Sequence, residues 1–85
     1  MSFEIECADQ TEVDHYWNLL IANGGSPGRC GWCKDRFGLS WQVTPTRLRE
    51  MFQSPDRAAA ERATKAMLEM DKIDVAVLEE AFRGE

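Results

Sequence analysis

The chain has 85 residues, of which 44% are hydrophobic and 29% are charged, and its formal net charge at pH 7 is -5. This length predicts one small domain, for which a metal, a disulfide or a second subunit often supplies part of the stability. The acidic balance argues against nucleic acid and anionic membranes as partners, and no apolar run is long enough to cross a bilayer.

The first ten residues, MSFEIECADQ, are acidic and lack the features of a signal peptide. We therefore expect a cytoplasmic protein. Its three cysteines are then expected to be reduced thiols, because disulfides are rare in that compartment.

The first part of the chain predicts a strand followed by a helix. Residues 2–7 alternate between polar and apolar side chains, with the two-residue period of a half-buried strand. Thr11 and Asp14 resemble a short capping box, and apolar residues then recur at helical spacing until Asn23. We expect this helix to cover the apolar face of the strand.

A hairpin is predicted next. Residues 30–37 form its first strand, Gly38 its turn and residues 39–44 its second strand. Residues 24–28 fit either a turn or a short irregular strand, and the sequence leaves both possibilities open.

After Pro45 the periodicity becomes helical. Three helices are predicted, at residues 46–53, from Pro55 to about Met70 after a cap at Ser54, and after a cap at Asp74. The residues expected to point inward are Leu48, Met51 and Phe52, then Ala59, Ala63, Ala66, Met67 and Met70, and finally Val75, Leu78, Ala81 and Phe82.

The predicted order of strand, helix, hairpin and three helices indicates an α+β domain. Three confident strands are few for a free-standing sheet, and the first and last would present open edges. We therefore expect a homodimer that completes the sheet.

Cys30 and Cys33 form a C-x-x-C motif, which is common in redox and zinc sites. A redox thiol is usually activated at a helix N-terminus, but a hairpin follows here. In a strand, residues three apart point to opposite faces, so the thiols could meet only at a bulge or a turn. Zinc would need further ligands, and only Cys7 and His15 remain. Packed cysteines are the favoured interpretation, with a redox or zinc role as the alternative.

Polar and aromatic strand residues are the candidates for a binding pocket. Glu4 and Glu6 could act as acid and base if their face lined a cavity, and otherwise they form a solvated strand face. Trp41 fits the core, whereas Trp32 fits either the core or a pocket wall. The sequence contains no glycine-rich phosphate loop and no nucleophile-elbow motif.

The run CGWCKDRFGLSWQVTP, at residues 30–45, closely resembles the C-G-W-L-K-D-K-F-G-x-S-W-Q-[IV]-x-P signature of PhnB-like proteins. These belong to the vicinal oxygen chelate superfamily, with glyoxalase I and the bleomycin resistance proteins. A preceding V-x-x-Y-W helix at Val13 and the run AMLEMDKID at residues 66–74 agree with the resemblance. The signature carries leucine at the position of Cys33, which implies a packing role for this thiol.

The resemblance implies a βαβββ module in residues 1–45, which curls into half of a cupped barrel, with residues 46–85 as a helical extension of the same compact domain. The match is to the family's second module, so a complete cup would need a second chain, unless the sequence is a shortened form of a longer parent. Metal-dependent members use a histidine and a glutamate at positions that fall near Ser2 and on Gln42. The resemblance therefore implies no divalent-metal site here. The family's frequent label as ubiquinone-pathway methyltransferases carries no expectation of methyl transfer, because no loop for a nucleotide-like cofactor is present.

We expect a homodimeric, metal-independent and cofactor-free module that binds a small molecule. The expected pocket residues are Glu4, Glu6, Trp32, Lys34 and Gln42. A ligand-free structural or dimerisation module is the alternative.

Overall fold

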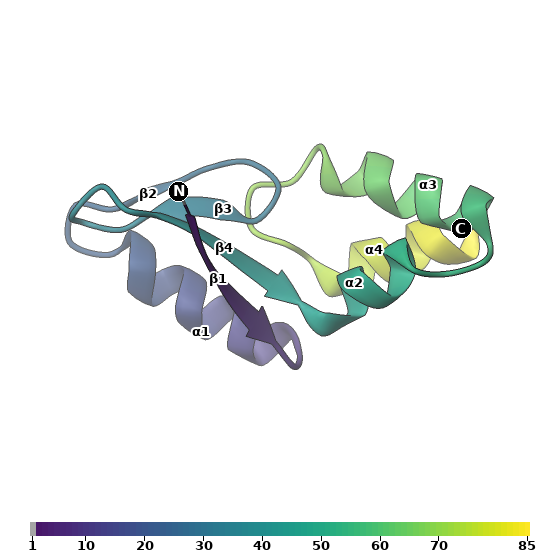
Figure 1. Cartoon of the computed structure of the whole chain (residues 1–85), viewed down its shortest axis with the longest axis horizontal. Coiled ribbons are helices and arrows are strands. Elements are labelled where there is room, and N and C mark those ends of the chain that lie inside the picture. Colours follow the sequence, from purple (N-terminus) through teal and green to yellow (C-terminus); the bar gives the residue numbers. More distant parts are fainter. Residues whose placement is uncertain (1) are drawn as a thin grey trace.

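In the computed structural model, described for residues 2–85, one helix lies along a four-stranded sheet and three helices group at one end of it (Figure 1). The elements follow in the order β1 (Ser2–Cys7), α1 (Gln10–Ile21), β2 (Ser26–Pro27), β3 (Trp32–Lys34), β4 (Ser40–Pro45), α2 (Thr46–Phe52), α3 (Arg57–Met67) and α4 (Val75–Arg83). The α+β prediction, with a βαβββ module before three helices, is confirmed.

The strand order in the sheet is β1-β4-β3-β2, with β1 parallel to β4 and the other pairs antiparallel. The expectation that the last strand forms an edge is wrong. The chain leaves β1 through α1 and returns as the β2–β3–β4 meander, which places β4 beside β1 in the interior of the sheet. The edges are β1 and β2, and β2 settles the open question at residues 24–28 as a two-residue strand.

One face of the sheet is covered by α1. Val13 and Trp17 of the helix form a buried cluster with Cys7 of β1, Cys33 of β3 and Val43 of β4, so the helix covers three strands rather than the first alone. Trp41 packs against this cluster, as predicted for a core residue. We call this side the covered face.

The hairpin has shorter strands than predicted. Cys30 and Gly31 both have positive φ angles, of 58° and 83°, so the backbone turns before Trp32 and β3 contains only three residues. At the other end, the Asp35 carboxylate accepts hydrogen bonds from the backbone N–H groups of Phe37 and Leu39 and closes the turn. Hydrogen bonds between a side chain and nearby backbone groups compete with the hydrogen bonds between strands and so shorten the strand. The alternation of polar and apolar residues does not reveal this competition.

The helix starts also differ from the predictions. Asp9 caps α1 by accepting from the backbone N–H of Glu12, whose carboxylate accepts from the N–H of Ala8 in return. This reciprocal box replaces the one predicted at Thr11, because it satisfies donors on both sides of the cap.

The α3 helix is also shorter than predicted. Asp56 caps it by accepting from the N–H of Ala59, so Ser54 and Pro55 lie before the helix, and the helix ends at Met67. In α4 the predicted cap at Asp74 is confirmed, and Gly84 ends the helix in the left-handed conformation.

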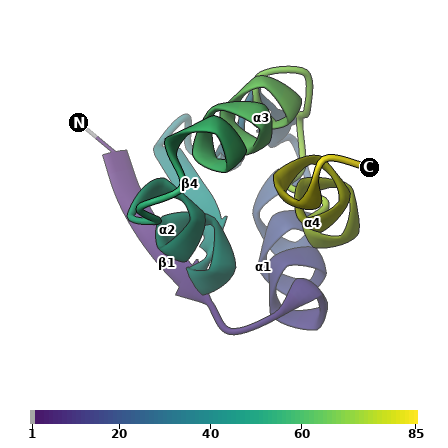
Figure 2. The ribbon, with the colours of Figure 1, turned by 90° about the vertical axis from the view of Figure 1, so that its right-hand side faces the viewer.

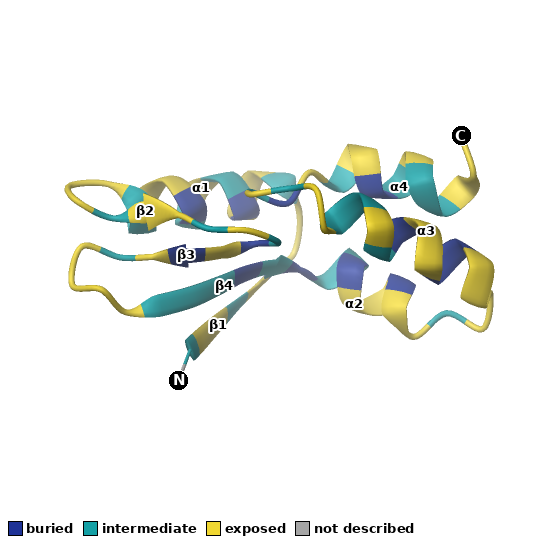
Figure 3. Cartoon of the chain, turned by 90° about the horizontal axis from the view of Figure 1, so that it is seen from above, coloured by how far each residue is buried: buried dark blue, intermediate teal, exposed yellow. Residues whose placement is uncertain are grey.

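A second buried cluster lies among the three C-terminal helices, which Figure 2 shows grouped together. It contains Leu48, Met51, Ala63, Ile73 and Leu78. Figure 3 shows that the buried positions follow the inner sides of these helices and of the sheet. Phe52, the last residue of α2, was predicted to point inward but is exposed, whereas Leu48 and Met51 of the same helix are buried.

Several hydrogen bonds join the helical extension to the βαβββ module. The backbone N–H groups of Cys30 and Gly31 donate to the carbonyls of Met70 and Asp71, both at 2.8 Å. From the other side, Gln10 donates to the carbonyl of Ile73 at 3.0 Å. The loop before β3 and the start of α1 therefore hold the connection between α3 and α4.

Within residues 2–85 the helices are all too short or too polar to span a lipid bilayer.

Candidate functional site

All five predicted pocket residues lie on the sheet face opposite α1. The strand register aligns Trp32 of β3 with Gln42 of β4 and Glu4 of β1 in one row across the sheet. Because paired residues point to the same side, Lys34 and Glu6 share this face in the neighbouring rows. We call this side the open face; its residues are Ser2, Glu4, Glu6, Ser26, Trp32, Lys34, Ser40, Gln42 and Thr44.

A hollow of about 330 Å³ lies where the open face meets the helical extension. This volume is at the lower end of the range for small-molecule sites. The sheet contributes Glu4, Trp32, Gln42 and Thr44, and Cys30 lies beside them. The helices contribute Leu48, Arg49, Phe52 and Met67. We call this the junction hollow. Three of the five predicted residues line it, whereas Glu6 and Lys34 lie outside it.

Arg49 is a site residue that the sequence analysis missed. Its Nη2 donates to Oε1 of Glu4 at 3.0 Å, and its Nε lies 3.7 Å from Oε1 of Glu6. One guanidinium thus faces both carboxylates, so the structure presents a charge-paired cluster instead of two isolated acids. The only sequence signal is that Arg49 lies between the apolar positions Leu48 and Met51, and this placement is normal for any solvated helix residue.

The resemblance assigns the ligands of metal-dependent members to positions near Ser2 and on Gln42. Here Gln42 Nε2 donates to Ser2 Oγ at 3.0 Å. Two neutral groups satisfy one another at this point, and neither supplies the anionic or imidazole donor that divalent metals favour. Across residues 2–85, His, Cys, Asp and Glu side chains form no group of three suited to a metal ion. These residues do not fit a divalent metal.

The two cysteines of the C-x-x-C motif lie on different sides of the sheet. Cys30 lines the junction hollow, whereas Cys33 is buried on the covered face. Burial, together with the nearby Asp35 carboxylate, raises the pKa of the Cys33 thiol. Burial, with smaller contributions from Glu12 and Asp9, raises the pKa of Cys7 to about 11. Both buried thiols are therefore protonated at neutral pH and lack the activation of a redox cysteine.

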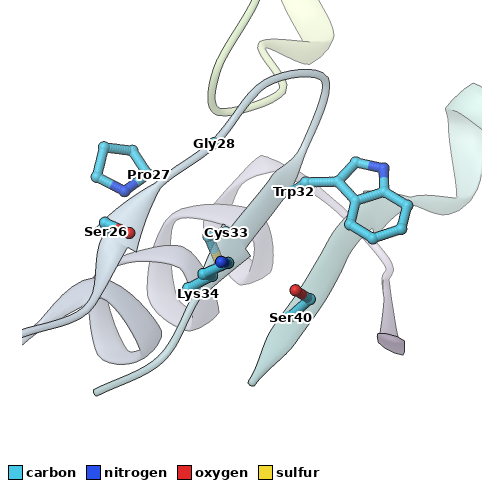
Figure 4. A pocket seen from close by; sticks show the side chains of 7 residues that line it. All are labelled: Ser26, Pro27, Gly28, Trp32, Cys33, Lys34 and Ser40. Atoms are coloured by element: carbon cyan, nitrogen blue, oxygen red, sulfur yellow. The ribbon is translucent and has the colours of Figure 1, made fainter. Parts of the chain in front are cut away.

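A second hollow, of about 260 Å³, lies on the open face on the other side of Trp32 (Figure 4). Lys34 lines it, together with Ser26, Pro27, Gly28 and Ser40, and part of Cys33. We call this the lysine hollow. Trp32 contributes to both hollows, and its side chain is 42% exposed. The predicted residues Trp32 and Lys34 are therefore brought together here.

The residues of this sheet and helix match a known family. The model of the 3-demethylubiquinone-9 3-methyltransferase family matches residues 1–44, which is more than half of the 85 residues. The chain belongs to the 3-demethylubiquinone-9 3-methyltransferase family. This membership confirms the PhnB-like, glyoxalase-type module that the CGWCKDRFGLSWQVTP run indicates. No curated protein matches the chain. The family match ends within β4, so Arg49 and the other helical residues of the junction hollow lie outside it.

Proposed function

We propose that this 3-demethylubiquinone-9 3-methyltransferase family member binds a small molecule in the junction hollow without the help of a metal. The observation that carries the proposal is that Glu4, Trp32 and Gln42 line one hollow together with Arg49. The hollow combines apolar walls with a few convergent polar groups, which is the usual composition of a ligand site.

Trp32 supports this proposal. An indole with 42% of its surface exposed, at the centre of a sheet face, leaves apolar area in water that a flat ligand would cover. Phe52 and Met67 offer further apolar surface from the opposite wall. A bound ring would thus contact both the sheet and the helical extension.

The polar groups of the junction hollow give the ligand its orientation. Arg49 retains N–H groups beyond the one that it donates to Glu4, because a guanidinium has five. Gln42 uses its amide nitrogen on Ser2, which leaves its carbonyl oxygen as an acceptor toward a ligand. Donor and acceptor therefore lie on two neighbouring elements, α2 and β4.

Metal independence is proposed because the hydrogen bond between Ser2 and Gln42 occupies the place where ligands would be needed. Methyl transfer, which the family description names, is not part of the proposal. The connection from β1 to α1 is only Ala8 and Asp9, which leaves no glycine-rich loop for a nucleotide-like methyl donor at that end of the strand.

We propose in addition that the chain forms a homodimer in the cytoplasm. Among residues 2–85, the six-residue strand β1 pairs with β4 alone and forms one edge of the sheet, while the β2 edge is two residues long and contains Pro27. Unpaired backbone groups along β1 favour pairing with a second copy. Sedimentation equilibrium at micromolar concentration should give a dimer, and a monomer would contradict this part of the proposal.

A thermal-shift screen of small aromatic and polar compounds tests ligand binding. Compounds that stabilise the wild-type protein should lose their effect in Trp32→Ala. Phe37→Ala is the matched control, because Phe37 is exposed in the hairpin turn outside the junction hollow. If no compound shifts the wild-type transition, the alternative of a ligand-free structural or dimerisation module is favoured.

The remaining alternative, a thiol or zinc protein, is tested separately. Elemental analysis should find no stoichiometric zinc, and thiol titration of the native protein should modify Cys30 well before Cys7 or Cys33. Rapid modification of Cys33 would show that the thiol is not sealed under α1.

A further inference from the structure

We propose that the lysine hollow binds the carboxylate of an aromatic acid whose ring lies against Trp32. This inference deepens the proposed function and rests on it, because it assigns a charge and a chemical class to the ligand of the open face. Trp32 lines both hollows, so a ring on this side chain lies within reach of the polar groups of each.

The strand register places a cation between two hydroxyl groups. Lys34 of β3 pairs with Ser26 of β2 on one side and with Ser40 of β4 on the other. Neighbouring strands are about 4.8 Å apart, so the three residues form a row across the sheet, with about 10 Å between the two serine positions. Figure 4 shows the three side chains side by side across their strands. An ammonium with two flanking hydroxyls offers the donors that a carboxylate accepts.

Lys34 is available for such a ligand. It is exposed, and it forms no ion pair with any residue from Ser2 to Glu85. The neighbouring carboxylate of Asp35 is held elsewhere, because it accepts from Trp41 Nε1 at 2.9 Å. By contrast, Arg49 on the same open face is already paired with Glu4 and lies near Glu6.

The walls of the lysine hollow explain why the acid should be aromatic. Trp32 gives the hollow an aromatic wall, Pro27 adds apolar surface at its β2 edge, and Gly28 adds no side chain. A free inorganic anion would leave this apolar surface in water, whereas an aryl carboxylate covers it and reaches Lys34. Glu4, the nearest open-face carboxylate in the row of Trp32, lies two strands away on β1 and is paired with Arg49.

Titration of the ¹⁵N-labelled full chain with benzoate and with benzyl alcohol tests the inference. The two probes share a phenyl ring and differ in the negative charge. We expect benzoate to shift the signals of the Lys34 amide and the Trp32 indole at concentrations where benzyl alcohol shifts only the indole. Added NaCl should weaken benzoate binding more than that of the alcohol, because salt screens the exposed ammonium.

Lys34→Gln should weaken benzoate binding about tenfold, which is the loss expected for one charge-assisted contact. Lys65→Gln is the matched control, since it removes the same charge from α3, where Lys65 pairs with Glu61. Equal weakening by both variants would show that net charge alone matters, and would overturn the inference.

The wild-type comparison decides the question even if a variant fails to fold. If benzyl alcohol binds as tightly as benzoate and both shift Trp32, the anionic subsite is wrong while the proposed small-molecule site stands. If neither probe shifts Trp32 and the compound screen also finds no ligand, the proposed function fails together with this inference.

Discussion

The covered and open faces of the sheet are made by the same strands, yet their side chains have opposite properties. On the covered face Cys7, Cys33 and Val43 are 0–2% exposed and pack against α1. On the open face Trp32 is 42% exposed, and Glu4 is paired with Arg49 in the lining of the junction hollow. Strand alternation thus separates residues that stabilise the fold from residues that are free to contact a ligand. Substitutions on the two faces should therefore change different measured quantities.

The C-x-x-C motif shows the same division over four residues. Cys33 belongs to the covered face, while Cys30 lies in the preceding loop and lines the junction hollow. The positive φ angles at Cys30 and Gly31 belong to a turn before β3, and this turn directs the loop toward Met70 and Asp71 and does not bring the thiols together.

The largest expected effect comes from replacing one tryptophan on each side of the sheet. Trp17→Ala should lower the free energy of unfolding by about 3–5 kcal/mol, because it leaves a large cavity under α1. Trp32→Ala should change it by only about 0.5 kcal/mol. Urea denaturation followed by far-ultraviolet circular dichroism measures both. If Trp32→Ala lowered the free energy of unfolding by a similar amount, Trp32 would contribute to the core and the two faces would not differ as described.

The buried Cys7 thiol gives the covered face an alkaline sensitivity. Its pKa rises to about 11 on folding from an ordinary value of 9.0, so the folded state keeps the proton longer than the unfolded state. The stabilisation is fully present below pH 9.0 and is lost as the pH rises toward about 11. The loss is on the order of 3 kcal/mol. Denaturation of the wild-type protein and of Cys7→Ala across this range should give profiles that converge at high pH, and parallel profiles would contradict the prediction.

Two glycines test whether the loop before β3 depends on close packing: Gly31 lies in that loop, and Gly38 lies in the turn between β3 and β4. Gly31 and Gly38 both have φ of 83°, so alanine at either position should cost about 1–2 kcal/mol of backbone strain. At Gly31 a Cβ would also lie 3.0 Å from Cγ1 of Ile73 and 3.1 Å from the carbonyl of Val43, whereas at Gly38 nothing lies within 4 Å. Gly31→Ala should therefore be more destabilising by about 1 kcal/mol. Equal losses in the two variants would show that the loop does not depend on close packing against Ile73.

The smallest effects are expected from the two ion pairs of α2. Arg47 donates to both carboxylate oxygens of Glu79, at 2.8 and 3.0 Å, in a half-buried pair inside the helical extension. The Arg49–Glu4 pair on the open face has one hydrogen bond and is more exposed. Double-mutant cycles should give a coupling of about 1 kcal/mol for the first pair and about 0.2 kcal/mol for the second. A larger coupling for Arg49 would show that the open face also stabilises the fold.

Acid titration gives a second test of the Arg47–Glu79 pair. Hydrogen bonding from Arg47 lowers the pKa of Glu79 below 4.5, so the stabilisation from the pair is present above pH 4.5 and is lost as the pH falls through the lowered value. Glu79→Gln should remove this part of the acid dependence, as measured by denaturation between neutral and acidic pH.

Local patterns predicted much of the covered face and several residues of the open face. The alternation at residues 2–7 separates Glu4 from the apolar positions, and the spacing of Val13 and Trp17 gives the helix that covers them. The cap at Asp74 and the stop at Gly84 were equally readable, because each depends only on neighbouring residues. By contrast, Arg49 could not be found, since its role depends on how α2 leaves β4 and approaches β1.

The sequence by itself determined the α+β class, the family, the hairpin and the side of the sheet to which Glu4, Glu6 and Gln42 belong, because these follow from short-range periodicity and a continuous motif. Only the tertiary structure decided that β4 is central, that Arg49 meets Glu4, and that Lys34 lies between two serines. These features depend on strand order, register and helix docking, which are set by contacts between residues far apart in the chain. The division between the covered and open faces is local in origin, but the two hollows beside Trp32 exist only once the chain has folded.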